Sequence, residues 1–118
     1  MEYSFERLEV WKKSRALVKH VYDTTRSFPE EEKFGLTSQI RRAAVSISSN
    51  IAEGSTRRSP RDQARFYEIS FGSLIEVLNQ LVLASDLEYV SADSLRGLRE
   101  RIDEIGRMLH SLRERART

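Results

Sequence analysis

Apolar residues recur along the chain at intervals of three and four, the spacing that predicts amphipathic α-helices. A first helix is expected over residues 5–26, with one stripe formed by Leu8, Trp11, Val18 and Tyr22 and widened by Val10, Leu17 and Val21. A second is expected over residues 36–55, with a stripe of Leu36, Ile40, Ala43, Ala44, Ile47 and Ile51. A fourth is expected over residues 92–115. Its steps are those of a left-handed bundle and join Leu95, Leu98, Ile102, Ile105, Leu109 and Leu112.

The third helix, expected over residues 60–87, is apolar around most of its circumference. Its apolar residues are Phe66, Tyr67, Ile69, Phe71, Leu74, Ile75, Val77, Leu78, Leu81, Val82 and Leu83. A helix of this kind must be covered on more than one side. Neighbouring helices of one small domain cover only part of it. The remainder predicts a partner subunit, with a ligand groove as the alternative.

Three short segments carry helix-start signals. Ser59-Pro60-Arg61-Asp62 combines a Ser cap, a Pro at the first helical position and an acidic residue in the first turn. Ser27 and Glu30 have the spacing of a capping box, which predicts a short helical turn after the first helix. Ser91 is expected to cap the last helix, whose final residues, 113–117, are expected to fray.

Four helices joined by short connections predict an antiparallel up-down-up-down four-helix bundle of the all-α class. A chain of 118 residues fits one domain, residues 1–118. Five Gly and two Pro residues are too few for a turn-rich β fold, and the absence of Cys excludes disulfides and thiolate metal sites. The apolar runs are far shorter than the ~20 residues that span a bilayer. We therefore expect a soluble, cytoplasmic protein without a signal peptide or membrane partner.

Charge is divided unevenly along the chain, although the net charge is only +2. Residues 41–65 contain six arginines and two acidic residues, a local charge of +4. Residues 66–90 contain four acidic residues and no Lys or Arg, a local charge of −4. This polarity predicts either attraction of an anion at one end or pairing of opposite ends in an assembly.

The arginines are the candidate nucleic-acid ligands. Arg57 and Arg58 lie in the connection before the third helix, and Arg61 and Arg65 lie in its first two turns, with Arg41 and Arg42 as weaker candidates. Guanidinium groups bind phosphate through paired hydrogen bonds, and a helix start attracts anions. No aromatic residue is interleaved with the cluster and no base-reading motif is present, so contact with the nucleic-acid backbone is the most that we expect. The alternative is that these arginines are solvated or pair with the acidic segment.

A polar stripe on the second helix is the other candidate site. It contains Ser46, Asn50 and Glu53, followed by Gly54, and its expected counterpart on the third helix is Gly72, Ser73 and Glu76. Small residues allow close helix approach, and buried polar groups need hydrogen-bond partners. We interpret the set as a network that fixes helix register or a subunit contact. Glu53 and Glu76 could alternatively act as an acid–base pair or bind a divalent ion. No Glu-x-x-His motif is present, and we expect no metal site, no cofactor and no catalytic residues.

The same residues resemble a known family. The matching segments are Leu8-x-x-Trp11, Phe28-Pro29-x-x-Glu32, Leu36-Thr37-x-Gln39-Ile40-Arg41-Arg42-Ala43-Ala44, Gly72-Ser73-Leu74-x-Glu76 and above all Ser46-Ile47-x-x-Asn50-Ile51-Ala52-Glu53-Gly54. They resemble the four-helix-bundle proteins encoded in intervening sequences of 23S ribosomal RNA genes. The resemblance implies a homopentameric ring and no established enzymatic activity. The family is also similar to accessory proteins of diversity-generating retroelements, which are basic pentamers that bind nucleic acid and reverse transcriptase.

Two functional hypotheses follow. The first is a non-enzymatic, homo-oligomeric scaffold that binds RNA or DNA backbone through its arginines. The second is a protein-interaction or structural module that binds no nucleic acid and recruits a protein partner, with the arginines serving subunit pairing.

Overall fold

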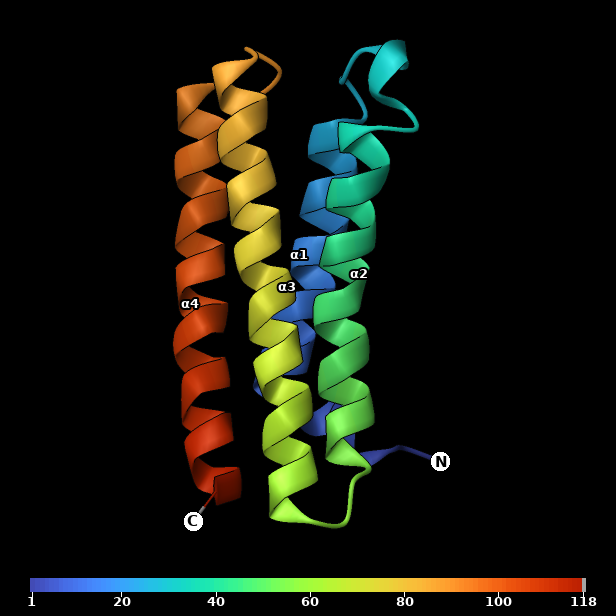
Figure 1. Cartoon of the computed structure of the whole chain (residues 1–118), viewed down its shortest axis with the longest axis vertical. Helices are drawn as coiled ribbons and strands as arrows, with labels where there is room; N and C mark the ends of the chain where they lie inside the picture. The colour runs from blue at the N-terminus through green and yellow to red at the C-terminus, as the bar shows by residue number, and fades with distance from the viewer. Residues whose placement is uncertain (118) are drawn as a thin grey trace.

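The computed structural model describes residues 1–117. Four α-helices dominate that range, so the all-α class is confirmed (Figure 1). In chain order the elements are the 3-10 helix η1 (Ser4–Arg7), α1 (Glu9–Thr25), the 3-10 helix η2 (Glu30–Glu32), α2 (Leu36–Ser55), α3 (Pro60–Asp86) and α4 (Ala92–Arg117). The first α-helix therefore begins later than expected, because Leu8 has an extended backbone (φ −73°, ψ 123°) that separates it from η1. Helix α4 continues through residues 113–117, which were expected to fray.

Each helix runs antiparallel to the next, and together they form an elongated body of 43 × 25 × 21 Å. α1 and α4 also lie side by side, joined by an ion pair of 3.4 Å between Lys13 Nζ and Glu104 Oε1. The α2–α3 connection, the start of α1 and the end of α4 lie at one end of the bundle, at the bottom of Figure 1. The α1–α2 and α3–α4 connections lie at the other. Within residues 1–117, no helix has the length and apolar character needed to cross a membrane.

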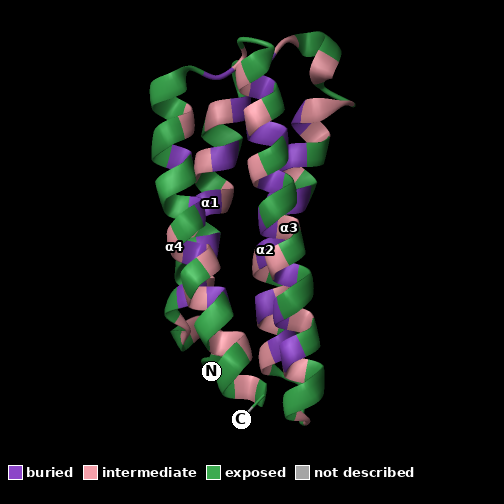
Figure 2. Cartoon of the chain, turned by 60° about the vertical axis from the view of Figure 1, so that its left-hand side comes forward, coloured by how far each residue is buried: buried purple, intermediate pink, exposed green. Residues whose placement is uncertain are grey.

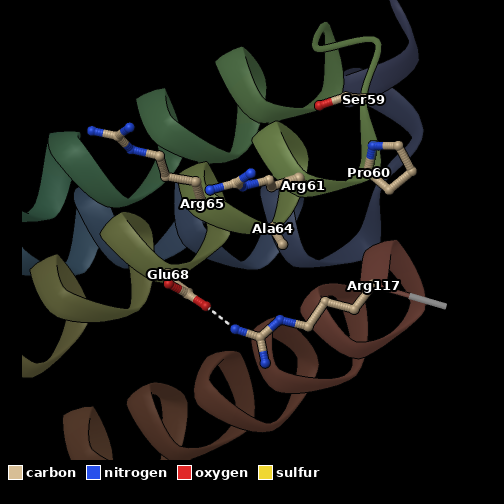
Figure 3. A pocket seen from close by; sticks show the side chains of 7 residues that line it. All are labelled: Ser59, Pro60, Arg61, Ala64, Arg65, Glu68 and Arg117. Atoms are coloured by element: carbon tan, nitrogen blue, oxygen red, sulfur yellow. Dashed lines mark hydrogen bonds and ion pairs between the residues drawn. The ribbon is translucent and has the colours of Figure 1, made fainter.

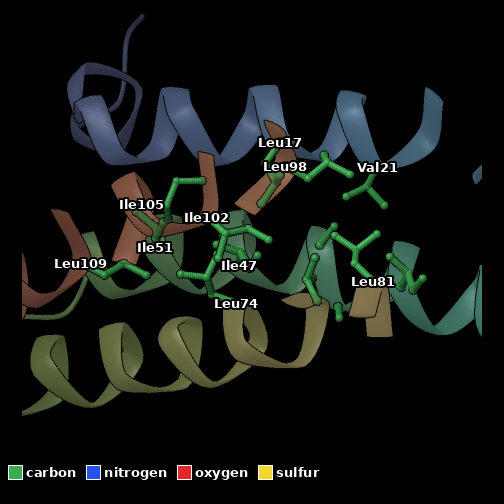
Figure 4. Close-up of a cluster of buried hydrophobic side chains, with 14 of the residues drawn as sticks. Leu17, Val21, Ile47, Ile51, Leu74, Leu81, Leu98, Ile102, Ile105 and Leu109 are labelled. Carbon is green, nitrogen blue, oxygen red and sulfur yellow. The ribbon is translucent and has the colours of Figure 1, made fainter. Parts of the chain in front are cut away.

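Buried positions recur along each of the four helices and meet in one core (Figures 2 and 4). The expected stripe of α1 is displaced. Val10, Leu17 and Val21 are its buried apolar residues, whereas Tyr22 is 37% exposed. The buried face also includes Ser14 and Thr25, whose hydroxyls donate to the main-chain oxygens of Trp11 (2.7 Å) and Val21 (2.8 Å). Because these side chains satisfy their own polarity within the helix, they can occupy core positions that a hydrophobicity pattern assigns to the surface.

Two of the three expected helix caps are present. Ser59 Oγ accepts from the Asp62 amide at 3.0 Å, and Ser91 Oγ accepts from the Ser94 amide at 3.1 Å. The expected capping box of Ser27 and Glu30 is wrong: Ser27 Oγ donates instead to the Thr24 carbonyl at the end of α1.

Glu32 is the residue that caps α2. Its Oε1 accepts from the Leu36 amide at 3.1 Å, and its Oε2 accepts from the Tyr89 hydroxyl at 3.1 Å. The Glu32 carboxylate therefore caps the start of α2 and also joins the α1–α2 connection to the α3–α4 connection. Tyr89 also packs against Phe28, with ring centroids 5.4 Å apart.

α3 ends in a Schellman motif. The Tyr89 amide donates to the Ala84 carbonyl at 2.8 Å, and the Glu88 amide donates to the Ser85 carbonyl at 3.0 Å. This closure requires a left-handed residue, and Glu88 has φ 66°. A side chain in that conformation costs about 1–2 kcal/mol, which glycine avoids.

We therefore expect Glu88→Gly to raise the free energy of unfolding by about 1 kcal/mol, after allowing for the greater flexibility of glycine in the unfolded chain. Glu88→Ala is the matched control, because it removes the carboxylate and keeps the strained Cβ. Chemical denaturation of both variants measures the difference. Equal stability of the two variants would contradict the interpretation.

Candidate nucleic-acid interface

The contact between α2 and α3 positions the candidate interface. Gly54, in the last turn of α2, is buried against the start of α3. A Cβ at Gly54 would lie 2.8 Å from Tyr67 Cε1 and 2.9 Å from Phe66 Cβ, closer than packed carbon atoms approach. Glycine at this position therefore lets the two helices touch one turn before the connection that carries the arginines.

Hydrogen bonds continue this contact along the two helices. The hydroxyls of Ser46 and Ser73 lie 2.8 Å apart, and Asn50 Nδ2 donates to the Ser46 carbonyl (2.8 Å) and hydroxyl (3.0 Å). The buried Ser70 hydroxyl donates to the Ile47 carbonyl at 2.8 Å. The structure thus brings Ser46, Asn50 and Ser73 together as one group. Ser70 was missed, although it stands at a core position of the α3 repeat.

The remaining residues of the polar set are separate from this group. Glu76 Oε2 accepts from Gln80 Nε2 at 3.4 Å, and the same amide lies 3.3 Å from Gln39 Oε1. Glu53 and Gly72 are exposed, and a Cβ at Gly72 would meet nothing within 4 Å. Among residues 1–117, no three His, Asp or Glu side chains are grouped to hold a metal ion.

The arginines of the α2–α3 connection lie on the surface beyond the Gly54 contact. Arg57, Arg58, Arg61 and Arg65 are all exposed. The Arg57 guanidinium lies over the Phe66 ring, 4.6 Å from its centroid, so an aromatic residue does accompany the cluster. Sequence reasoning overlooked this ring because its helical position was assigned to the core.

The end of α4 adds further arginines to the same end of the bundle. Arg117 forms an ion pair with Glu68 across α3 and α4 (Figure 3). These two residues line an open groove of about 560 Å³ together with Ser59, Pro60, Arg61, Ala64 and Arg65. Burial raises the pKa of the Tyr67 phenol, and the nearby positive charge of Arg115 partly opposes this increase. The arginine-rich end is therefore defined as Arg57, Arg58, Arg61, Arg65, Arg113, Arg115 and Arg117.

Arg41 and Arg42 do not belong to the arginine-rich end. They lie in the opposite half of α2, and the 14 helical steps from Arg41 to Ser55, its last residue, correspond to about 21 Å. Arg41 Nε donates to Thr25 Oγ1 at 2.8 Å, and its guanidinium lies 4.5 Å from the centroid of the Tyr22 ring. These contacts join α2 to α1, which gives Arg41 a structural role.

The fold and the polar contact between α2 and α3 define a small all-α protein of four α-helices within residues 1–117. The model of the 23S rRNA-intervening sequence protein family matches residues 6–111. The chain belongs to this family.

Comparison with solved structures supports the same fold. The chain is similar to a protein of unknown function of the S23 ribosomal protein family from Bacteroides thetaiotaomicron, with 24% sequence identity and a TM-score of 0.78. The similarity covers 87% of this chain and 96% of the other. No curated protein matches the sequence.

The Gly54 contact makes a prediction about stability. Gly54→Ala should lower the free energy of unfolding by about 1–3 kcal/mol, because the added methyl overpacks the contact with Tyr67 and Phe66. Gly97→Ala is the matched control: a Cβ at this exposed helical position meets nothing within 4 Å, and alanine should stabilise the helix by up to about 1 kcal/mol. Unfolding by denaturant measures whether each substitution lowers or raises the free energy of unfolding. A stabilising Gly54→Ala would refute the close-contact interpretation.

Proposed function

We propose that the chain is a non-enzymatic, cytoplasmic, homo-oligomeric scaffold whose arginine-rich end binds the phosphate backbone of RNA or DNA. The observation that carries the proposal is the convergence of two arginine clusters, far apart in sequence, at one end of the bundle. Seven arginines gather there, together with Asp62, Glu68 and Glu114 of the same segments and Glu2, Glu6 and Glu9 of the N-terminal segment. Clustered, exposed guanidinium groups attract a polyanion.

The chemistry of this end favours phosphate over bases. Arg58, Arg61 and Arg65 are exposed side chains around an open groove and the adjoining connection, without a projecting recognition helix. Long, exposed guanidinium groups can follow a phosphate backbone without reading its sequence. Phe66 is already covered by Arg57, so stacking of an unpaired base would require that arginine to move.

A homopentameric ring is part of the proposal and comes from the resemblance to pentameric proteins. Rotational symmetry would place the arginine-rich ends of all copies at equivalent positions. Several weak phosphate contacts on one nucleic acid would then act together, so that the ring binds more tightly than one copy.

The second candidate function is a protein-interaction or structural module. Two of the arginines have intramolecular contacts, Arg57 with Phe66 and Arg117 with Glu68, which favours a structural contribution from the cluster. In this alternative, the arginine-rich end would contact another subunit or an acidic protein partner.

The two functions are separated by filter binding of labelled RNA and DNA over a series of salt concentrations. We expect affinity to fall steeply with salt. The double variant Arg61→Gln/Arg65→Gln should weaken binding to all sequences alike and reduce the logarithmic salt slope by about 1 for each phosphate contact removed. Arg96→Gln/Arg99→Gln is the matched control, because it removes the same charge from the first turns of α4, at the opposite end of the bundle.

Binding without salt dependence, or no binding at low salt, would exclude the phosphate-backbone function. Equal loss in the two double variants would show that net charge, and not the arginine-rich end, determines affinity.

A further inference from the structure

One side of α3 remains exposed although it carries large apolar residues. Ile69, Leu83 and Leu87 are 44%, 44% and 53% exposed, and exposed positions recur along this helix (Figure 2). The α3 outer stripe is defined as Ile69, Gly72, Glu76, Asn79, Leu83 and Leu87, all of them exposed. Successive members are three or four residues apart, which places them on one face of the helix.

Gly72 in this stripe has no explanation within the protomer. It lies in the middle of a 27-residue helix, where glycine is less favourable than alanine. Unlike Gly54, it faces open space, since a Cβ would meet nothing within 4 Å. Its lack of a side chain would instead allow another backbone or side chain to approach α3 closely.

The charge of the stripe indicates what kind of surface fits it. Between residues 66 and 90 the chain has four acidic residues and no Lys or Arg. Glu76 is the one acidic member of the stripe and lies near its middle, whereas the apolar members Ile69, Leu83 and Leu87 lie toward its two ends. The complementary surface should therefore be basic opposite Glu76 and apolar on either side of it.

Such a surface exists on the outer side of α1 and α2. Tyr22 and Val45 are 37% and 42% exposed. The contact between Arg41 and Tyr22 sets the register of the two antiparallel helices, so that Val45, one turn further along α2, is level with Val18. The α1–α2 basic face is defined as Arg15, Val18, Lys19, Tyr22, Arg42 and Val45.

The cations of this face are available for an intermolecular contact. Lys19 and Arg42 are exposed, and within residues 1–117 neither forms an ion pair. Arg15 lies over the Trp11 ring, 5.5 Å from its centroid, and keeps its charge at the surface. An open groove of about 540 Å³ runs beside Arg15 and Lys19 and is lined by Lys12, Arg15, Ala16, Val18, Lys19 and Tyr22.

We propose that the α3 outer stripe of one copy docks on the α1–α2 basic face of a second copy. Ile69 at one end of the stripe, and Leu83 and Leu87 at the other, would pack against apolar side chains of the neighbour. Gly72 would allow the close approach, and Glu76, near the middle, would face cations of the neighbour. Within residues 1–117, α3 contacts α2 and α4 but not α1, so the two faces lie on different sides of one protomer. The contact is therefore head-to-tail, and repetition closes a ring or extends a filament. This inference rests on the proposed self-association and names the surfaces that produce it.

Analytical ultracentrifugation of the full chain and two face variants tests the proposal. Leu83→Arg places a cation in the stripe, and Val45→Asp places an acid in the basic face. Each variant alone should sediment as a single chain. Their mixture should recover particles of at least two chains, because each variant retains the intact face that the other lacks. Arg99→Asp, on the outer side of α4 and outside both faces, should retain the wild-type mass.

Gly72→Ala tests the same contact with a minimal change. The protomer should melt at an equal or higher temperature, because the methyl meets open space and alanine favours the helix. The apparent dissociation constant of the assembly should rise by about tenfold, since the methyl separates the two surfaces.

The possible failures are distinct. A wild-type chain that sediments as one chain at micromolar concentrations would overturn both self-association and this contact. An oligomeric wild type whose mass survives Leu83→Arg and Val45→Asp would overturn the contact and leave self-association intact. Dissociation by Leu83→Arg alone, without recovery on mixing, would replace the head-to-tail contact by a symmetric contact between two α3 stripes. Nucleic-acid binding is measured independently and does not decide among these results.

Discussion

The close contact between α2 and α3 is the constraint on which the rest of the structure depends. Because Gly54 has no side chain, Tyr67 and Phe66 can lie against the last turn of α2. Ser70 and the Ser46–Ser73 pair then hold the two helices in one register over several turns. A wider separation would break these hydrogen bonds and leave the buried Ser70 hydroxyl without its partner, at a cost of about 1–3 kcal/mol. The contact therefore determines both where the arginine connection emerges and which side of α3 remains exposed.

The exposed side of α3 and the arginine-rich end are linked consequences of that geometry. α2 and α4 cover two sides of α3, so within residues 1–117 its third side has no neighbouring helix. Glu76 lies on this third side, Glu68 pairs with Arg117 of α4, and the arginines of α3 are confined to its first two turns. A head-to-tail contact along the α3 outer stripe would leave the basic end uncovered. The same separation of charge thus suits assembly through the side of the bundle and polyanion binding at its end.

Periodicity predicted the helices well because most core positions are occupied by large aliphatic residues. The Ser59 and Ser91 caps could also be predicted from the sequence, since each hydroxyl accepts a hydrogen bond from an amide three residues further along the chain. The missed features depend on tertiary position or on polarity that is satisfied locally. Ser14 and Thr25 entered the core through bonds to their own helix, and Glu32 took the capping role expected of Ser27. The arginine cluster was half predicted: local sequence identified Arg57 to Arg65, but only the antiparallel packing of α4 brings Arg117 beside them, and Arg41 proved to be distant.

The helix dipole stabilises some arginines of the arginine-rich end and destabilises others, depending on which end of a helix they lie at. Arg113, Arg115 and Arg117 lie in the last turns of α4, where a cation is favoured by the helix dipole. Arg57, Arg58 and Arg61 surround the start of α3, where the dipole opposes a cation by about 0.3–1 kcal/mol each when exposed. Mutual repulsion adds to that cost, and Asp62 is the one acidic residue in the first turn. Local stability therefore favours fewer cations at this helix start. A phosphate bound at this helix start would offset both the unfavourable helix dipole and the repulsion among the arginines. Its negative charge would be stabilised by the dipole and would neutralise the guanidinium groups.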